Sequence, residues 1–194
     1  MWIILRSSRA LMLSVGAALA VATGGVAATA PPASVVAAVS PRVAGPPWIS
    51  IEYPANPFDQ STRGAHLLVH AFYHGTPVNY PVSGTAEGIV AGQRRTITLR
   101  FETTSRTGVY ALRKQWPSEG AWTLVISVTQ SDREEGGVAQ ALVELSPTGA
   151  VTGVQVPTRQ YAEGAFPRRL TSEEIERAVR ANAQRVALAG RARS

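Results

Sequence analysis

The sequence has 194 residues, no cysteine and a formal net charge of +6. The absence of cysteine excludes disulfides, thiolate metal sites, cysteine nucleophiles and a lipid-modified cysteine. The positive charge lies at the ends: residues 31–158 hold nine basic and nine acidic residues, whereas residues 159–194 hold eight arginines and four glutamates. A nucleic-acid-binding surface needs clustered cations, so we expect no nucleic-acid partner for this neutral body.

The first thirty residues have the layout of a secretory signal. Arg6 and Arg9 precede an apolar run that continues in alanine, valine and glycine as far as Ala30. An uncleaved membrane anchor over residues 10–30 is the alternative, since about 20 apolar residues span a bilayer. Residues 1–30 therefore predict a signal peptide or anchor and an exported protein, either periplasmic or extracellular.

The hydrophobic pattern changes to a period of two from Trp48 onward. Before it, residues 31–47 contain five prolines and predict a flexible Pro/Ala-rich linker. In the clearest strand, Ile97, Leu99 and Phe101 alternate with polar side chains, which is typical of a strand with one buried face. Strands are expected at residues 49–53, 65–73, 85–90, 96–102, 109–116, 122–129, 138–145 and 151–156.

These short strands are separated by glycine, proline and polar turns, without helices between them. Parallel sheets need helical crossovers, so the pattern favours an all-β fold, an antiparallel β-sandwich over residues 48–158. Ala91-Gly92-Gln93 predicts a hairpin turn. The charged segment 131–137 predicts a solvated loop.

The last part of the chain, residues 159–194, is a basic tail with a helical pattern. Thr171 and Glu174 have the spacing of a capping box, and apolar residues then recur near helical period. We expect one amphipathic helix over residues 172–189. Its stripe is narrow and alanine-rich, which predicts loose docking or a free helix. The tail's arginines are either solvated charge or a contact for anionic lipid or an acidic partner.

Three short motifs lie beside predicted strands. They are Gly75-Thr76-Pro77-Val78, Gly108-Val109-Tyr110-Ala111 and Gly120-Ala121-Trp122-Thr123-Leu124. With them, residues 64–129 resemble the YtkA-like and FixH-like exported domains. The resemblance implies an immunoglobulin-like fold in the bacterial envelope, sometimes associated with copper or oxidase assembly. The sequence departs from a copper-chaperone pattern because its two methionines, Met1 and Met12, lie in the signal segment.

All three histidines, His66, His70 and His74, fall in one predicted strand. Their spacing places all three on the same face of the strand, but neighbouring histidines on an extended strand lie roughly 13 Å apart. Nitrogen ligands lie about 2.1 Å from zinc, so the three cannot share one ion. A copper or zinc site would need one histidine with acids from adjacent strands. Candidate acids are Asp59, Glu87 and Glu102. The other interpretation is that these are hydrogen-bonded structural histidines.

No catalytic motif accompanies these residues. The sequence contains no Gly-x-Ser-x-Gly elbow, phosphate-binding glycine loop or His-Glu-x-x-His motif. We therefore expect a non-enzymatic binding module of the bacterial envelope, without a cofactor, whose partner is an envelope protein or ligand. A periplasmic metal-handling accessory protein is the second interpretation, and an enzyme of unknown type is the third. Contact with a membrane is expected only through an uncleaved N-terminal segment or the basic tail.

Overall fold

A computed structural model describes residues 45–130 and 137–191, which belong to one compact unit, Arg42–Ser194. The predicted signal or anchor, residues 1–30, lies outside the described residues. So do residues 31–44 of the linker and residues 131–136 of the solvated loop.

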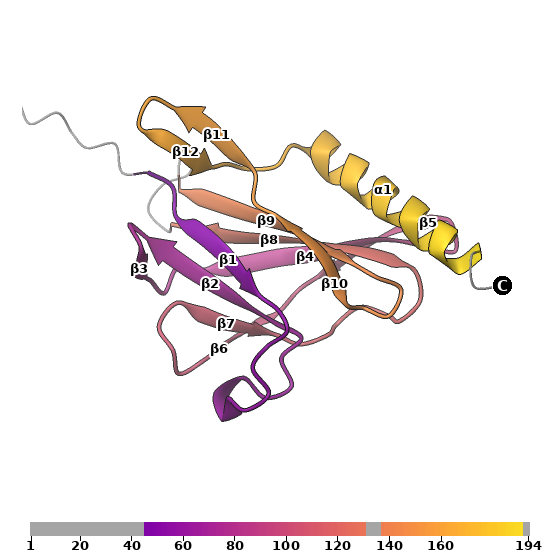
Figure 1. The fold of residues 1–194 in the computed structure, drawn as a ribbon, viewed down its shortest axis with the longest axis horizontal. Helices are drawn as coiled ribbons and strands as arrows, with labels where there is room; N and C mark the ends of the chain where they lie inside the picture. Colours follow the sequence, from indigo (N-terminus) through magenta and orange to yellow (C-terminus); the bar gives the residue numbers. More distant parts are fainter. Residues whose placement is uncertain (1–44, 131–136, 192–194) are drawn as a thin grey trace, which may run out of the picture. The chain divides into compact units, whose positions relative to one another are not determined.

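The described residues form two five-stranded antiparallel sheets and a separate two-stranded hairpin (Figure 1). The first sheet has the order β1-β2-β7-β6, with β3 also paired to β2. Its strands are β1 (Trp48–Glu52), β2 (Leu67–Tyr73), β3 (Thr76–Pro77), β6 (Phe101–Thr103) and β7 (Val109–Leu112). The second sheet has the order β10-β9-β8-β4-β5. Its strands are β4 (Val82–Val90), β5 (Gln93–Thr98), β8 (Ala121–Thr129), β9 (Val138–Leu145) and β10 (Val151–Gln155).

The hydrophobic core lies between the two sheets and follows the predicted alternation. Leu67 and Val69 of β2 pack in the same buried cluster as Leu124 and Ile126 of β8. The shared interior confirms the antiparallel sandwich-like architecture predicted from the period of two.

A large aromatic ring in this core depends on a glycine in the neighbouring strand. Trp122 is 3% exposed and its indole N–H donates to the Glu119 carbonyl over 2.8 Å. Gly88 lies opposite Trp122 in the register, and a Cβ on Gly88 would lie 2.5 Å from the indole ring. Glycine at this position therefore leaves the space that the ring occupies.

The single strand predicted at residues 96–102 is in fact two strands. β5 ends at Thr98 in the second sheet, and β6 begins at Phe101 in the first. Leu99, between them, is buried and its N–H donates to the Gly84 carbonyl over 2.9 Å. The alternation survives because Ile97, Leu99 and Phe101 all contact the same core while the chain crosses between the sheets.

A hairpin follows β10 in the segment predicted as a basic tail. It consists of β11 (Thr158–Tyr161) and β12 (Gly164–Pro167), which pair only with each other. These strands and β3 were not predicted from the sequence, because each is very short and has no clear alternation. A 3-10 turn, η1 (Gln60–Thr62), lies in the loop between β1 and β2.

The C-terminal helix is α1 (Ser172–Arg191), close to the predicted range. Its capping box is confirmed: Thr171 Oγ1 accepts from the Glu174 N–H over 3.2 Å, and Glu174 Oε2 accepts from the Thr171 N–H over 2.8 Å. Among the described residues, no helix is long and apolar enough to cross a membrane.

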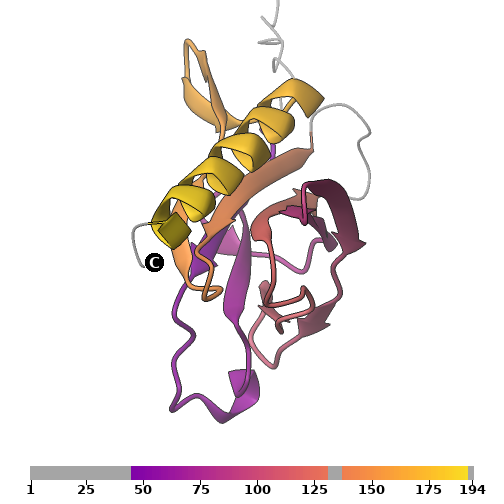
Figure 2. The same cartoon turned by 90° about the vertical axis from the view of Figure 1, so that its right-hand side faces the viewer.

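The expectation that this helix docks loosely or stands apart is wrong. α1 lies along the outer face of the second sheet and contacts β8, β4 and β9 (Figure 2). Val179 is fully buried, and Asn182 is 2% exposed. The Asn182 amide donates to the carbonyls of Trp122 and Leu145 over 2.8 and 3.2 Å. A narrow apolar stripe is therefore enough to dock the helix, because a buried amide and ion pairs add to the contact.

Ion pairs on this face connect the helix to the strands. Arg94 of β5 lies 2.9 Å from a carboxylate oxygen of Glu87 and 3.2 Å from one of Glu176 on the helix. At β9, Arg185 lies 2.6 Å from Glu144. The Arg94–Glu176 and Arg185–Glu144 pairs thus connect α1 to β5 and β9.

We predict that Asn182→Ala lowers the free energy of unfolding by about 1–3 kcal/mol, because two carbonyls lose a buried donor. Urea denaturation monitored by tryptophan fluorescence measures the change. Gln184→Ala, at an exposed position of the same helix, is the control and should stay within about 0.5 kcal/mol of the parent. Equal stability of both variants would contradict this role of Asn182.

Candidate functional site

His66 precedes β2 and lies among aromatic rings. Its ring centroid is 5.5 Å from that of Tyr53 and 5.1 Å from that of Trp116, the latter in an edge-to-face arrangement. Its Nε2 atom is buried and has no hydrogen-bond partner among the described residues. Burial, and then the charge of Lys114, lower the pKa of His66, while a hydrogen bond with the Gly149 backbone opposes this shift. This histidine is therefore held in its neutral form.

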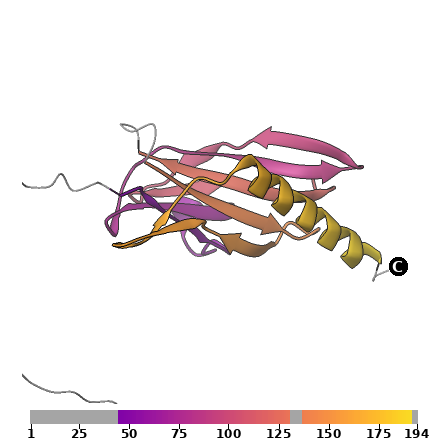
Figure 3. The same cartoon turned by 90° about the horizontal axis from the view of Figure 1, so that it is seen from above.

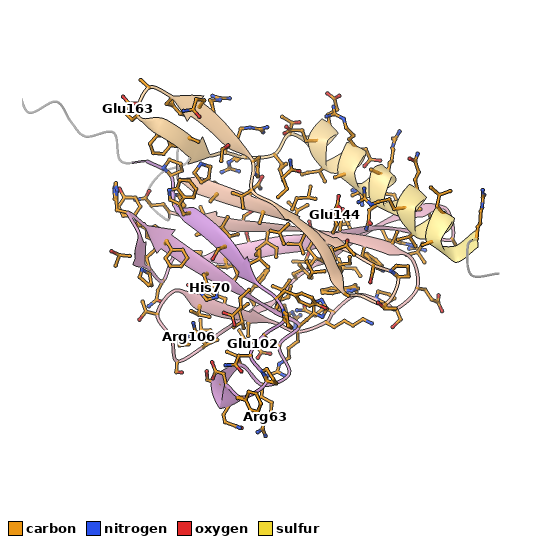
Figure 4. All side chains as sticks on the ribbon, in the orientation of Figure 1. Arg63, His70, Glu102, Arg106, Glu144 and Glu163 are labelled. Carbon is orange, nitrogen blue, oxygen red and sulfur yellow. The ribbon has the colours of Figure 1, made fainter. Side chains whose placement is uncertain are left out.

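His70 lies on the outer face of the first sheet, in the middle of β2 (Figure 4). Its Nε2 atom is 2.9 Å from Oε2 of Glu52 on the adjacent strand β1, and its ring stacks against Phe72 with centroids 6.1 Å apart. His70 and Glu52 have side chains that are 14% and 33% exposed. Glu52 was not among the candidate acids predicted from the sequence. It lies two residues after Ser50, which is opposite His70, so Glu52 is on the same face as His70.

His74 lies in the tight turn between β2 and β3. It has a positive φ of 50° and is exposed, with its ring 4.3 Å from that of Tyr73. The structure thus places the three histidines in three different environments. Within residues 45–130 and 137–191, no group of three or more metal-ligating side chains comes together.

The three acids considered as metal donors from the sequence have other partners. Asp59 caps η1 by accepting from the Ser61 N–H over 2.9 Å. Glu87 of β4 pairs with an arginine of β5 that also contacts the helix. Glu102 of β6 accepts a hydrogen bond from the Arg113 guanidinium. The ion pairs are Asp59–Arg106 at 3.6 Å, Glu87–Arg94 at 2.9 Å and Glu102–Arg113 at 3.1 Å. None of the three acids contacts a histidine within the described structure.

A groove of about 560 Å³ lies between α1 and the β9–β10 side of the second sheet. Leu142 of β9 and Ala178 and Ala181 of the helix provide apolar lining, because two alanines three residues apart leave room beside the strand. The volume falls within the range of about 300–1,000 Å³ that is usual for ligand sites. The groove could not be identified from sequence, because it exists only where the helix docks.

Two ion pairs bound this groove. Arg168 donates to both carboxylate oxygens of Glu174 over 2.8 and 2.6 Å, and Glu144 pairs with Arg185. The hydrogen bond from Arg168, together with that from the Thr171 N–H, lowers the pKa of Glu174 to about 2. The carboxylate therefore stays charged over the whole physiological range. The groove therefore presents a mostly polar surface, in which a few apolar side chains lie between paired charges.

Four of the eight arginines of the predicted basic tail have carboxylate partners within the chain. They are Arg168 with Glu174, Arg177 with Glu173, Arg180 with Glu176 and Arg185 with Glu144. These pairs interrupt the basic surface along α1.

Comparisons of the chain with protein-family models, with curated proteins and with solved structures return no match. The site must therefore be interpreted from its own geometry.

We predict that the domain loses stability as the pH falls from about 7 because of His66. Its pKa in the folded state is lower than in the unfolded chain, so the unfolded state binds the proton first and is favoured at lower pH. The loss occurs between the unfolded pKa and the lower folded pKa. His66→Phe should flatten this dependence in urea titrations from pH 8 to 5.

His74→Asn is the matched control, because position 74 is exposed and asparagine tolerates a positive φ. It should keep the pH slope of the parent protein. A slope that survives His66→Phe unchanged would mean that another group causes it.

Proposed function

We propose that the protein is an exported, non-enzymatic binding module of the bacterial envelope, in which the groove beside α1 receives the ligand. The observation that carries this proposal is the groove itself, a space of about 560 Å³ between a docked helix and a sheet, whose exposed lining is mostly polar. Side chains such as Gln155, Glu174 and Arg177 line it and offer hydrogen-bond donors and acceptors. The ligand class we favour is an extended peptide segment of an envelope protein, whose backbone groups these side chains would hydrogen-bond.

The strand order supports an immunoglobulin-like assignment. Lettered by chain order, β1-β2-β7-β6 corresponds to strands A-B-E-D, and β9-β8-β4-β5 corresponds to G-F-C-C′. β10 and α1 are then additions after the last strand of the sandwich. The groove is built from these additions, which makes it particular to this chain rather than to the fold.

Export rests on the sequence of residues 1–30. The resemblance to YtkA-like and FixH-like domains is part of the same proposal. Its three glycines, Gly75, Gly108 and Gly120, all have positive φ and each immediately precedes a strand. The shared motif is thus explained by turn geometry, which supports a likeness of fold and carries over no site.

We expect a photo-reactive benzoylphenylalanine at position 181 to cross-link a ligand in living cells, with mass spectrometry identifying the adduct. Position 187, exposed on the same helix, provides the matched control and should give no adduct. Ala178→Trp, which fills the groove, should abolish the adduct at position 181, whereas Ala187→Trp should not. Equal adducts at positions 181 and 187, or none at either, would contradict the proposal.

Metal handling is the second candidate, favoured by the pair of His70 and Glu52. Their facing atoms are 2.9 Å apart, a hydrogen-bond distance, whereas two ligands at about 2.1 Å from one tetrahedral zinc ion lie about 3.4 Å from each other. A small outward shift of the two side chains would let the pair supply two ligands of a zinc or copper ion, with water completing the coordination. His66 and His74 would lie outside this site.

Protein purified without a histidine tag should then carry about one zinc or copper ion, detected by elemental analysis and by a rise in melting temperature on adding metal. His70→Gln should remove the effect and His74→Gln should leave it intact. Absence of bound metal, or equal binding by His70→Gln, would rule this candidate out.

A further inference from the structure

The β11–β12 hairpin carries exposed aromatic surface at one end of the domain. Tyr161 is 49% exposed, and its ring lies edge-on to that of Phe166 with centroids 5.7 Å apart. Trp48, at the start of β1, is 40% exposed. The described chain begins beside the hairpin, because Gly45 packs against the Phe166 ring, with its Cβ position 3.1 Å away.

This end is opposite the C-terminal end of α1. Figures 1 and 3 show the hairpin and the start of β1 together at one end of the sandwich, while α1 runs toward the other end. Exposed tyrosine and tryptophan rings are amphipathic, with an apolar body and a polar N–H or O–H group. Such rings gather where water meets lipid headgroups.

The hairpin and the residues just after it also carry two exposed arginines. Arg159 in β11 and Arg169 just after β12 make no ion pair with any described residue, in contrast to the four paired arginines of the tail. The hairpin's one acid, Glu163, lies at its tip (Figure 4). Two unneutralised cations beside exposed rings match a negatively charged lipid surface.

We propose that Trp48, Arg159, Tyr161 and Arg169, which we call the aromatic-basic end, rest on the headgroups of an anionic membrane. This inference goes beyond the groove and rests on the export part of the proposed function. An anchor ending at residue 30 would hold Gly45 within fifteen residues, or at most about 50 Å, of the membrane. The contact would be reversible and weakened by salt, because its charges are few and exposed.

The absence of cysteine permits site-specific spin labels. We would label Ala162→Cys in the hairpin and Ala187→Cys in α1, both exposed, in the full chain reconstituted with phosphatidylglycerol-containing vesicles. In electron paramagnetic resonance, the spin label at position 162 should become less accessible to a water-soluble nickel relaxation agent. The label at position 187 should keep its accessibility. Arg159→Glu with Arg169→Glu should restore accessibility at position 162, and circular dichroism checks that this variant folds.

Equal accessibility at both positions would overturn the proposal, as would equal protection on purely phosphatidylcholine vesicles. Protection that appears only when another envelope protein is added would also overturn it. The double arginine variant should keep the cross-link at position 181, so failure of the lipid contact and failure of the groove are separate results. Cell fractionation with mass analysis of the N-terminus tests export independently of both.

Discussion

The docking of α1 on the second sheet is the contact on which the groove depends. It combines one fully buried valine, Val179, with one buried amide, Asn182, and the ion pairs of Arg94 and Arg185. A buried amide is costly unless it is hydrogen-bonded, and its directional bonds fix the position of the helix along the strands. The small alanines at positions 178 and 181 then leave room for the groove beside the strand.

Polar side chains connect neighbouring elements on both outer faces of the sandwich. Glu87 and Glu144 connect the second sheet to its helix, and Asp59 organises the loop over the first sheet through η1. His70 and Glu52 join β1 to β2 where β1 is an edge strand.

Much of the sandwich was predictable, because alternation depends on side-chain direction within a few residues. The strands around Val69, Trp122 and Val143 were located this way, and the capping box at Thr171 located the helix. The break between β5 and β6 at Leu99 was not predictable. The core is continuous across the two sheets, so the hydrophobic alternation does not change where the chain crosses from one sheet to the other. The groove and the partnership of His70 with Glu52 depend on which strands and helices become neighbours, which local patterns do not specify.

The start of β1 and the last turn of α1 lie at opposite ends of the domain (Figure 1). A polypeptide fused after α1 would leave from the end opposite to the start of β1 (Figure 1). A fluorescent or enzymatic reporter attached there would report position without covering the hairpin.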